Sequence, residues 1–187
     1  MSAPDLVLAT APADILEVAA FGDQAPELVR RGGEADWALP PLGGVSVAPA
    51  GLALAVRPER WLMVLAPAAP GASAARWQGL LGTSGAVVEL SAGLAAFFLA
   101  GAPAREVLRR GCRLDLDPEV FPQGCAAATH MAQVAVTLAA LPGGLLLVTP
   151  ASTARHLREW LLHAGRPFGL VAASDVSVAR LAGELRA

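Results

Sequence analysis

The sequence predicts an α+β protein made of two similar ferredoxin-like halves, each with an antiparallel sheet and helices packed on one face. Two observations lead to this fold class. Short stretches of alternating apolar and polar residues are separated by glycine- and proline-rich turns. The elements also follow the order β-α-β-β-β-α and then, loosely, β-β-α-β-β-β-α. With 187 residues, the chain is long enough to bury a core without disulfides or metals.

We expect the chain to divide into four segments. Residues 1–13, rich in alanine and proline, have the composition of a loose N-terminal arm. Residues 14–85 form the first α+β half and residues 86–170 the second. Residues 171–187 are a C-terminal extension that ends in a short helix over 175–186.

The first half begins with an alternating strand at residues 14–20. A short helix follows at 24–31, with Pro26 in its first turn, where a missing N–H costs nothing. The remaining expected elements are strands at 45–47, 52–56 and 61–66, the last two joined by a turn containing Pro58, and a helix at 73–81.

The second half opens with strands at 86–90 and 94–100. Pro103 then begins a helix at 104–110, which Gly111 ends, because glycine tolerates the positive φ found just past a helix. The buried stripe of this helix consists of Ala104, Val107 and Leu108. Its outer face carries arginines, and Glu106 and Arg110 stand in the i,i+4 order that favours an ion pair.

Residues 120–154 contain no aspartate, glutamate, lysine or arginine. Glycines, prolines and polar residues interrupt this run, so it does not have the pattern of a membrane span. Alternation predicts a strand at 132–140 with its even-numbered residues on one face, and a hairpin at 141–144 leads to a strand at 145–149. Ser152 is a candidate N-cap for a helix at 153–164, whose buried face includes Trp160.

Composition excludes several classes of function. The net charge of −2 argues against general nucleic-acid binding, and all 14 basic residues are arginine, so no lysine is present to form a Schiff base. The N-terminus lacks the pattern of a signal peptide, which favours a cytoplasmic protein. Cys112 and Cys125 then suit reduced, small apolar side chains better than a disulfide or a site.

We assign no catalytic, cofactor-binding or metal-binding residue. His156 and His163 are spaced seven apart on one helix, which does not suit a metal site, and His130 lies on the face of a strand. Asp115 and Asp117 alternate and would act as acid and base only if buried, so a solvated loop is the preferred interpretation. The chain has no GxGxxG, Walker or GxSxG motif.

The best candidate surface is formed by Arg105, Arg109, Arg110 and Arg113. The helix dipole alone favours positive charge at the end of this helix. The same residues suit binding of a carboxylate, a phosphate or an acidic partner. The 55% hydrophobic content and mean hydropathy of +0.51 fit either an alanine-rich core or an apolar surface covered by a partner.

Three motifs carry a resemblance to a known family: GAPA at 101–104, GCRLDL at 111–116 and FPQG at 121–124. With the helix sequence that follows them, residues 87–169 resemble the gamma subunit of heterotetrameric sarcosine oxidases. That family is a short relative of the aminomethyltransferase-type folate-binding domain. The resemblance implies the same two-part α+β architecture and larger flavoprotein subunits as partners.

What the resemblance implies about function is a non-catalytic, structural subunit. The larger subunits of such complexes bind FAD, FMN, NAD and tetrahydrofolate, and the complex demethylates sarcosine oxidatively and passes the one-carbon unit to folate. Two alternatives remain open. The chain is a stand-alone folate-binding or one-carbon transfer protein, or it is a gamma-like subunit of a complex of the N-methylglutamate dehydrogenase type.

Overall fold

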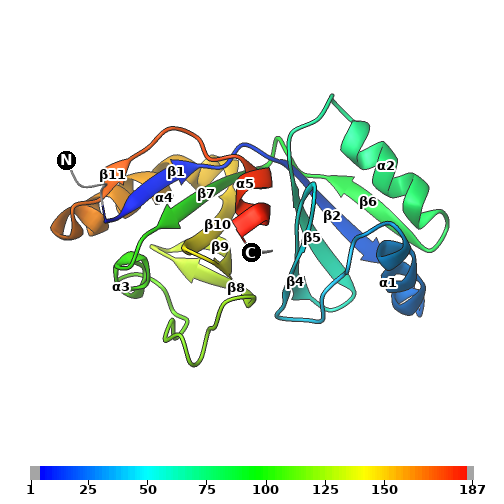
Figure 1. The fold of residues 1–187 in the computed structure, drawn as a ribbon, viewed down its shortest axis with the longest axis horizontal. Helices are drawn as coiled ribbons and strands as arrows, with labels where there is room; N and C mark the ends of the chain where they lie inside the picture. Colours follow the sequence, from blue (N-terminus) through cyan, green and yellow to red (C-terminus); the bar gives the residue numbers. More distant parts are fainter. Residues whose placement is uncertain (1–4, 185–187) are drawn as a thin grey trace. The chain divides into compact units, whose positions relative to one another are not determined.

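The computed structural model describes residues 5–184 and contains two sheets, each in a compact unit of its own (Figure 1). The first unit comprises Pro12–Ala92 and the chain from Ser177 onward. The second comprises the chain up to Ala11 and Gly93–Val176. The predicted α+β class with two antiparallel sheets is confirmed.

The first unit has a five-stranded antiparallel sheet in the order β3-β4-β5-β2-β6. Read as β6-β2-β5-β4, four of these strands follow the 4-1-3-2 order of the ferredoxin-like motif. The elements of this unit are β2 (Asp14–Ala20), α1 (Ala25–Glu34), β3 (Val45–Ala48), β4 (Gly51–Arg57), β5 (Arg60–Leu65), α2 (Ala72–Leu81), β6 (Gly85–Glu89) and α5 (Val178–Glu184).

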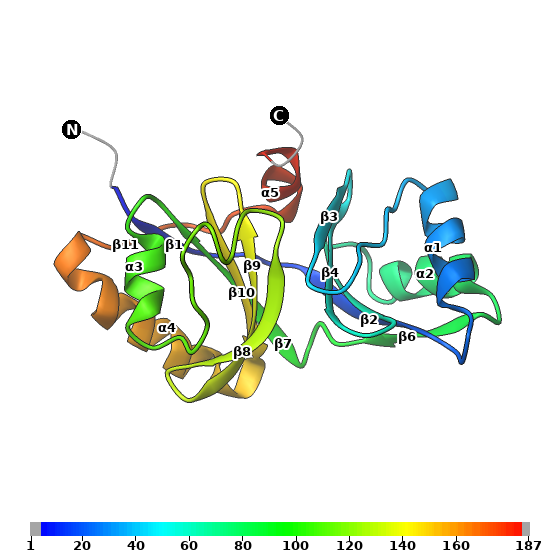
Figure 2. The same ribbon diagram turned by 90° about the horizontal axis from the view of Figure 1, so that it is seen from below.

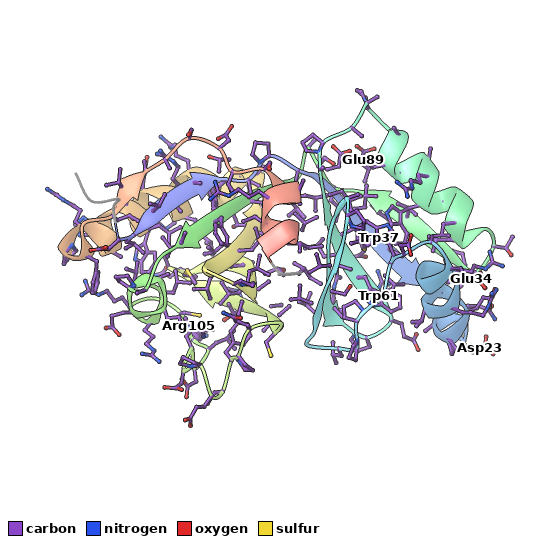
Figure 3. All side chains as sticks on the ribbon, viewed as in Figure 1. Asp23, Glu34, Trp37, Trp61, Glu89 and Arg105 are labelled. Carbon is purple, nitrogen blue, oxygen red and sulfur yellow. The ribbon has the colours of Figure 1, made fainter. Side chains whose placement is uncertain are left out.

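Helices α1 and α2 cover one face of this sheet (Figures 1 and 2). Their buried side chains include Leu28 and Trp77, and the ring of Trp77 meets Trp37 edge-on at 5.3 Å between centroids. The indole N–H of Trp61 donates to the carbonyl of Pro40 at 2.9 Å, so this buried ring leaves no polar atom unpaired. Figure 3 shows Trp37 and Trp61 on the helix side of the sheet.

The second unit has a six-stranded sheet in the order β11-β1-β7-β10-β9-β8. In this order β7, β9 and β10 take the places of the first, second and third strands of the same motif, and β1, which comes first in the chain, takes the place of the fourth. Helices α3 and α4 pack on one face. Among the strands of residues 5–184, only β1 and β11 pair in parallel. Its elements are β1 (Val7–Thr10), β7 (Leu94–Ala100), α3 (Ala104–Arg109), β8 (Ala126–Met131), β9 (Val134–Leu141), β10 (Gly144–Pro150), α4 (Ala151–Gly165), the 3₁₀ helix η1 (Arg166–Phe168) and β11 (Val171–Ala172).

The expectation of a loose arm over residues 1–13 was wrong for its described part. Strand β1 lies between β7 and β11, with Val7 opposite Ala100, and Leu6 and Leu8 are fully buried or nearly so. A four-residue strand is too short to show a clear period, so local sequence does not reveal it. Residues 1–4 lie outside the described part of the chain.

The uncharged region folds as two consecutive hairpins rather than one. Val134, Val136, Leu138 and Ala140 are buried, as the alternation predicted. The preceding strand, β8, ends in a two-residue turn at 132–133 that the sequence did not signal. Such turns need positive φ at both positions and favour Asn-Gly, whereas this turn is Ala-Gln, with φ of 49° and 68°.

Helix α4 begins earlier than predicted. Pro150 occupies the N-cap position, and Ser152 makes no capping hydrogen bond. Instead the hydroxyl of Thr153 donates to the Pro150 carbonyl at 3.1 Å. The predicted N-cap role of Ser152 is therefore wrong, and the helix starts where proline can precede it without losing a donor.

Candidate partner-binding surface

The arginine surface predicted from the sequence lies on α3 and on the segment that follows it. The missing N–H of Pro103 makes it a suitable residue for the N-cap of α3, and Ala104, Val107 and Leu108 face the core. Arg110 caps the C-terminus. The expected Glu106–Arg110 pair does not form, since Glu106 faces Arg109 at 3.6 Å instead.

Arg105, labelled in Figure 3, is half-buried and hydrogen-bonded within the protein. Its guanidinium donates to the carbonyl of Leu116 at 2.8 Å and thereby holds the following loop against α3. Burial, and after it the nearby positive charge of Arg109, lower the pKa of Arg105. Its role is to fix the loop, and little of its charge is offered to a partner.

Arg109 is also paired within the chain. Besides Glu106, it contacts a carboxylate oxygen of Asp117 at 3.4 Å. The other oxygen of Asp117 accepts from the Glu119 N–H, and Asp115 accepts from the Asp117 N–H. These two aspartates therefore cap local turns, which agrees with the solvated-loop interpretation.

Arg110 and Arg113 remain without a carboxylate partner in the part of the chain that the structure describes. Arg110 lies over the ring of Phe168, 4.8 Å from its centroid, and donates weakly to the Ala164 carbonyl at 3.4 Å. Arg113 is exposed. Of the four predicted arginines, Arg105 and Arg109 are thus held by groups near α3, Arg110 contacts the end of α4, and Arg113 is exposed without such a contact among residues 5–184.

The outward pair lines a groove that we call the Trp160 groove. Its volume is about 620 Å³, and its lining residues are Arg110, Gly111, Arg113, His130, Ala132, Gln133 and Trp160. Sequence reasoning placed Trp160 in the core and did not single out Ala132 or Gln133. The sequence feature that could have pointed to them is Gln133, a polar residue within the long uncharged stretch that predicts strands.

The histidines do not form a metal centre. His130 lines the groove, His156 makes a 3.2 Å hydrogen bond to the carbonyl of Ala132, and His163 is exposed. Among residues 5–184, no three His, Cys, Asp or Glu side chains are grouped to bind a metal ion. Cys112 and Cys125 are free, half-buried and packed on the core.

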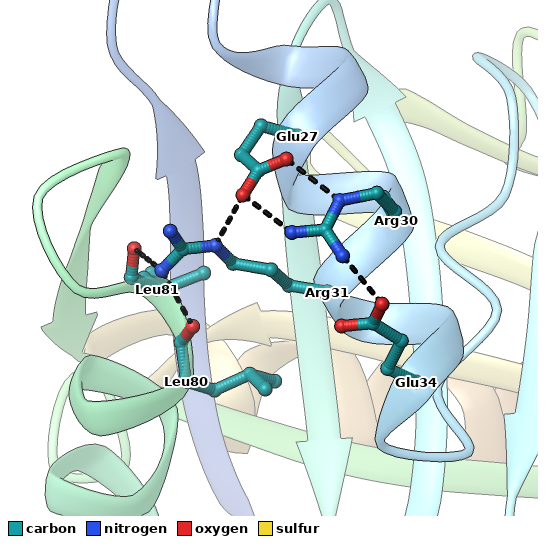
Figure 4. Close-up of polar contacts among 6 residues, drawn as sticks. All are labelled: Glu27, Arg30, Arg31, Glu34, Leu80 and Leu81. Atoms are coloured by element: carbon teal, nitrogen blue, oxygen red, sulfur yellow. Dashed lines mark hydrogen bonds and ion pairs between the residues drawn. The ribbon is translucent and has the colours of Figure 1, made fainter.

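Four arginines of the first unit pair with glutamates of the same chain, and Figure 4 shows two of them, Arg30 and Arg31. Arg30 and Arg31 both donate to Glu27, and Arg31 also donates to the carbonyl of Leu81 at 3.0 Å at the end of α2. Hydrogen bonds from the two guanidinium groups lower the pKa of Glu27 to about 2. Glu17, on β2, likewise pairs with two arginines, Arg57 at the end of β4 and Arg60 at the start of β5.

Comparison with known proteins decides the family. The profile of the sarcosine oxidase gamma subunit family matches residues 41–166, more than half of the chain. This chain belongs to the sarcosine oxidase gamma subunit family. The predicted resemblance is confirmed, and the match reaches well into the first half of the chain.

A solved structure supports the assignment over nearly the full length. The gamma-family chain superimposes on a chain of the heterotetrameric sarcosine oxidase from Corynebacterium sp. U-96 with a TM-score of 0.77 and 26% identity, covering 94% of this chain and 90% of that one. A search of curated protein sequences finds no match.

A second solved structure shares the fold alone. Aminomethyltransferase T of the Bartonella henselae glycine cleavage system matches with a TM-score of 0.66 and 19% identity. The match covers 92% of this gamma-family chain and 48% of the aminomethyltransferase, so this chain spans about half of that enzyme. Within the described range, no helix is both long and apolar enough to cross a membrane.

Proposed function

We propose that this chain is the small, structural subunit of a cytoplasmic heterotetrameric sarcosine oxidase. The observation that carries the proposal is the family match, supported by superposition on the Corynebacterium oxidase along nearly all of both chains. In this role the chain completes the assembly, and larger subunits carry out the chemistry.

The chemistry assigned to the larger subunits is the oxidative demethylation of sarcosine. FAD, FMN, NAD and tetrahydrofolate belong to those subunits, and the one-carbon unit passes to the folate. This chain contributes binding surface to the complex, and we assign it no catalytic residue. The arginine surface, above all Arg110 and Arg113, is the face we propose for contact with a larger subunit.

The two alternative functions have less support. A stand-alone folate-binding protein would rest on the aminomethyltransferase match, which is a likeness of fold at 19% identity. A subunit of an N-methylglutamate dehydrogenase would need a match to such complexes, whereas the matching family is that of sarcosine oxidase.

The test is purification of the tagged chain from its own cells, followed by native mass measurement and a visible absorption spectrum. The proposal expects a yellow assembly that contains larger chains and consumes oxygen when sarcosine is added. A colourless monomer would refute the subunit role. A yellow assembly that oxidises another N-methyl amino acid but not sarcosine would refute the substrate.

A further inference from the structure

The Trp160 groove carries uncompensated positive charge. In the first unit, four arginines (Arg30, Arg31, Arg57 and Arg60) each pair with a glutamate of the same chain, whereas Arg76 pairs with none in the part that the structure describes. Arg110 and Arg113 have no such partner among residues 5–184. A guanidinium group presents a planar fork of donors that fits a carboxylate, so two guanidinium groups without a carboxylate partner on one groove favour an acidic ligand.

The part of the groove that the β8–β9 turn forms is held in place by its backbone and by His156. The amide of Ala132 donates to the carbonyl of Gly111 at 3.2 Å, and His156 bonds to the carbonyl of Ala132 at 3.2 Å. Both turn residues, Ala132 and Gln133, have the positive φ that non-glycine residues rarely adopt. These contacts fix the exposed Gln133 at the edge of the groove, and its amide has no hydrogen-bond partner in the described chain.

The contact between Gly111 and Trp160 in the lining is equally well defined. A Cβ atom on Gly111 would lie 2.5 Å from Cζ2 of Trp160, so the indole ring rests directly on the backbone at this glycine. The ring is half-buried, so it offers part of its apolar face to the groove that Arg110 and Arg113 also line. A rigid aromatic surface beside cations and an amide is typical of the residues that anchor protein interfaces.

We infer that the Trp160 groove binds an acidic segment of a larger subunit, with the segment's carboxylates on Arg110 and Arg113 and an apolar side chain against Trp160. This inference rests on the proposed function. A segment fits better than a single small anion, because the hydrogen bond to Ala164 places Arg110 at the C-terminal end of α4. Arg166, which follows α4, is exposed and has no carboxylate partner in the described chain. The positive charge therefore extends from Arg110 to Arg166, beyond the lining of the groove.

The test is a competition during assembly. A tagged variant and the untagged wild-type chain are co-expressed with the larger subunits, and native mass spectrometry measures the share of each in the complex. Arg113→Glu should enter the complex about tenfold less often than the wild-type chain, because it replaces attraction by repulsion at the interface. Arg113→Lys, which keeps the charge but loses the fork, should lie between the two.

Arg76→Glu is the matched control. Arg76 is an exposed arginine on α2 in the first unit and, like Arg113, forms no ion pair within the described residues. Reversing it changes the net charge equally, so it should compete on equal terms with the wild-type chain. Arg113 makes no hydrogen bond or ion pair inside the described chain, so its loss does not weaken the fold.

Each outcome decides between the two proposals. If Arg113→Glu and Arg76→Glu enter the complex equally with the wild-type chain, the groove is not the docking site, and the subunit role stands. If both variants are excluded alike, net charge rather than the groove controls assembly, and the inference is overturned. If the wild-type chain itself forms no complex, the proposed function fails and the inference fails with it.

Discussion

Two adjacent glycines in α1 offer a sensitive test of the packing described above. Both gain the same helix propensity when changed to alanine, about 1 kcal/mol, because alanine loses less backbone entropy than glycine. Their surroundings differ. A Cβ at Gly32 would lie 2.7 Å from the carbonyl oxygen of Trp37 and 3.2 Å from Cγ of Leu39, whereas a Cβ at Gly33 would meet no atom within 4 Å.

The expected magnitude follows from this difference. Gly33→Ala should raise the free energy of unfolding by about 0.5–1 kcal/mol. Gly32→Ala needs the backbone at Trp37 to move, which costs about 1–3 kcal/mol, so the two variants should differ by that amount. For a chain of this size, each 1 kcal/mol corresponds to a shift of roughly 2–4 °C in Tm.

The assay is thermal unfolding followed by circular dichroism, with urea unfolding as a second measure. The two variants have the same composition, so charge and solubility cannot explain a difference between them. Equal Tm values for Gly32→Ala and Gly33→Ala would show that the close approach of Gly32 to Trp37 is not present in solution.

Three further predictions concern the core, the second sheet and one carboxylate. Leu108→Ala should lower the free energy of unfolding by about 2–5 kcal/mol, since this side chain is fully buried, and a loss below about 1 kcal/mol in urea unfolding would contradict its place in the core. Gly144→Ala should prevent β10 from closing on β7, because a Cβ there would lie 2.3 Å from a backbone carbonyl of β7, and normal amounts of folded protein would contradict that register. Glu27 should titrate near pH 2 by NMR and stay charged at pH 4, because hydrogen bonds from Arg30 and Arg31 lower its pKa from 4.5 to about 2. The small contribution of ionised Glu27 to stability is then fully present above about pH 4.5 and is lost as the pH falls toward 2. If Arg31→Ala leaves the pKa of Glu27 unchanged, the hydrogen bond from Arg31 is not a cause of the lowered pKa.

Much of the fold follows from short-range patterns. Strand β2, Asp14–Ala20, has the bounds that the alternation predicted. The helix after Pro103 ends one residue before the predicted position, with the predicted three residues buried. Such elements can be predicted from the sequence because proline, glycine and period-two alternation determine the backbone conformation of residues only a few positions away.

The features that sequence reasoning missed depend on distant residues. Strand β1 is defined by its pairing with β7, which lies in the other half of the sequence. The turn at Ala132 and Gln133 lacks turn-forming residues and is held by contacts from Gly111 and His156. Tertiary contacts of this kind override local propensity, so the groove they build cannot be found by a local pattern.

The placement of β1 has a consequence for the synthesis of the protein. Neither unit is a continuous stretch of chain, since β1 pairs with β7 and β11, and α5 contacts β4 and β5. The ribosome has therefore released the apolar side chains of Leu6 and Leu8 long before their partner strand emerges. The second unit in particular cannot complete its sheet until β7 and β11 have been synthesised, whereas the first unit lacks only α5 once Ala92 has emerged.

Pairings between such distant residues form slowly, because a long loop must close before the contacts are gained. During that interval the first strand is an unpaired apolar edge, which is the kind of segment that chaperones bind and that aggregates when it is left exposed. We expect the yield of folded chain to depend on how soon this early strand meets its partner, and less on the final stability of either sheet.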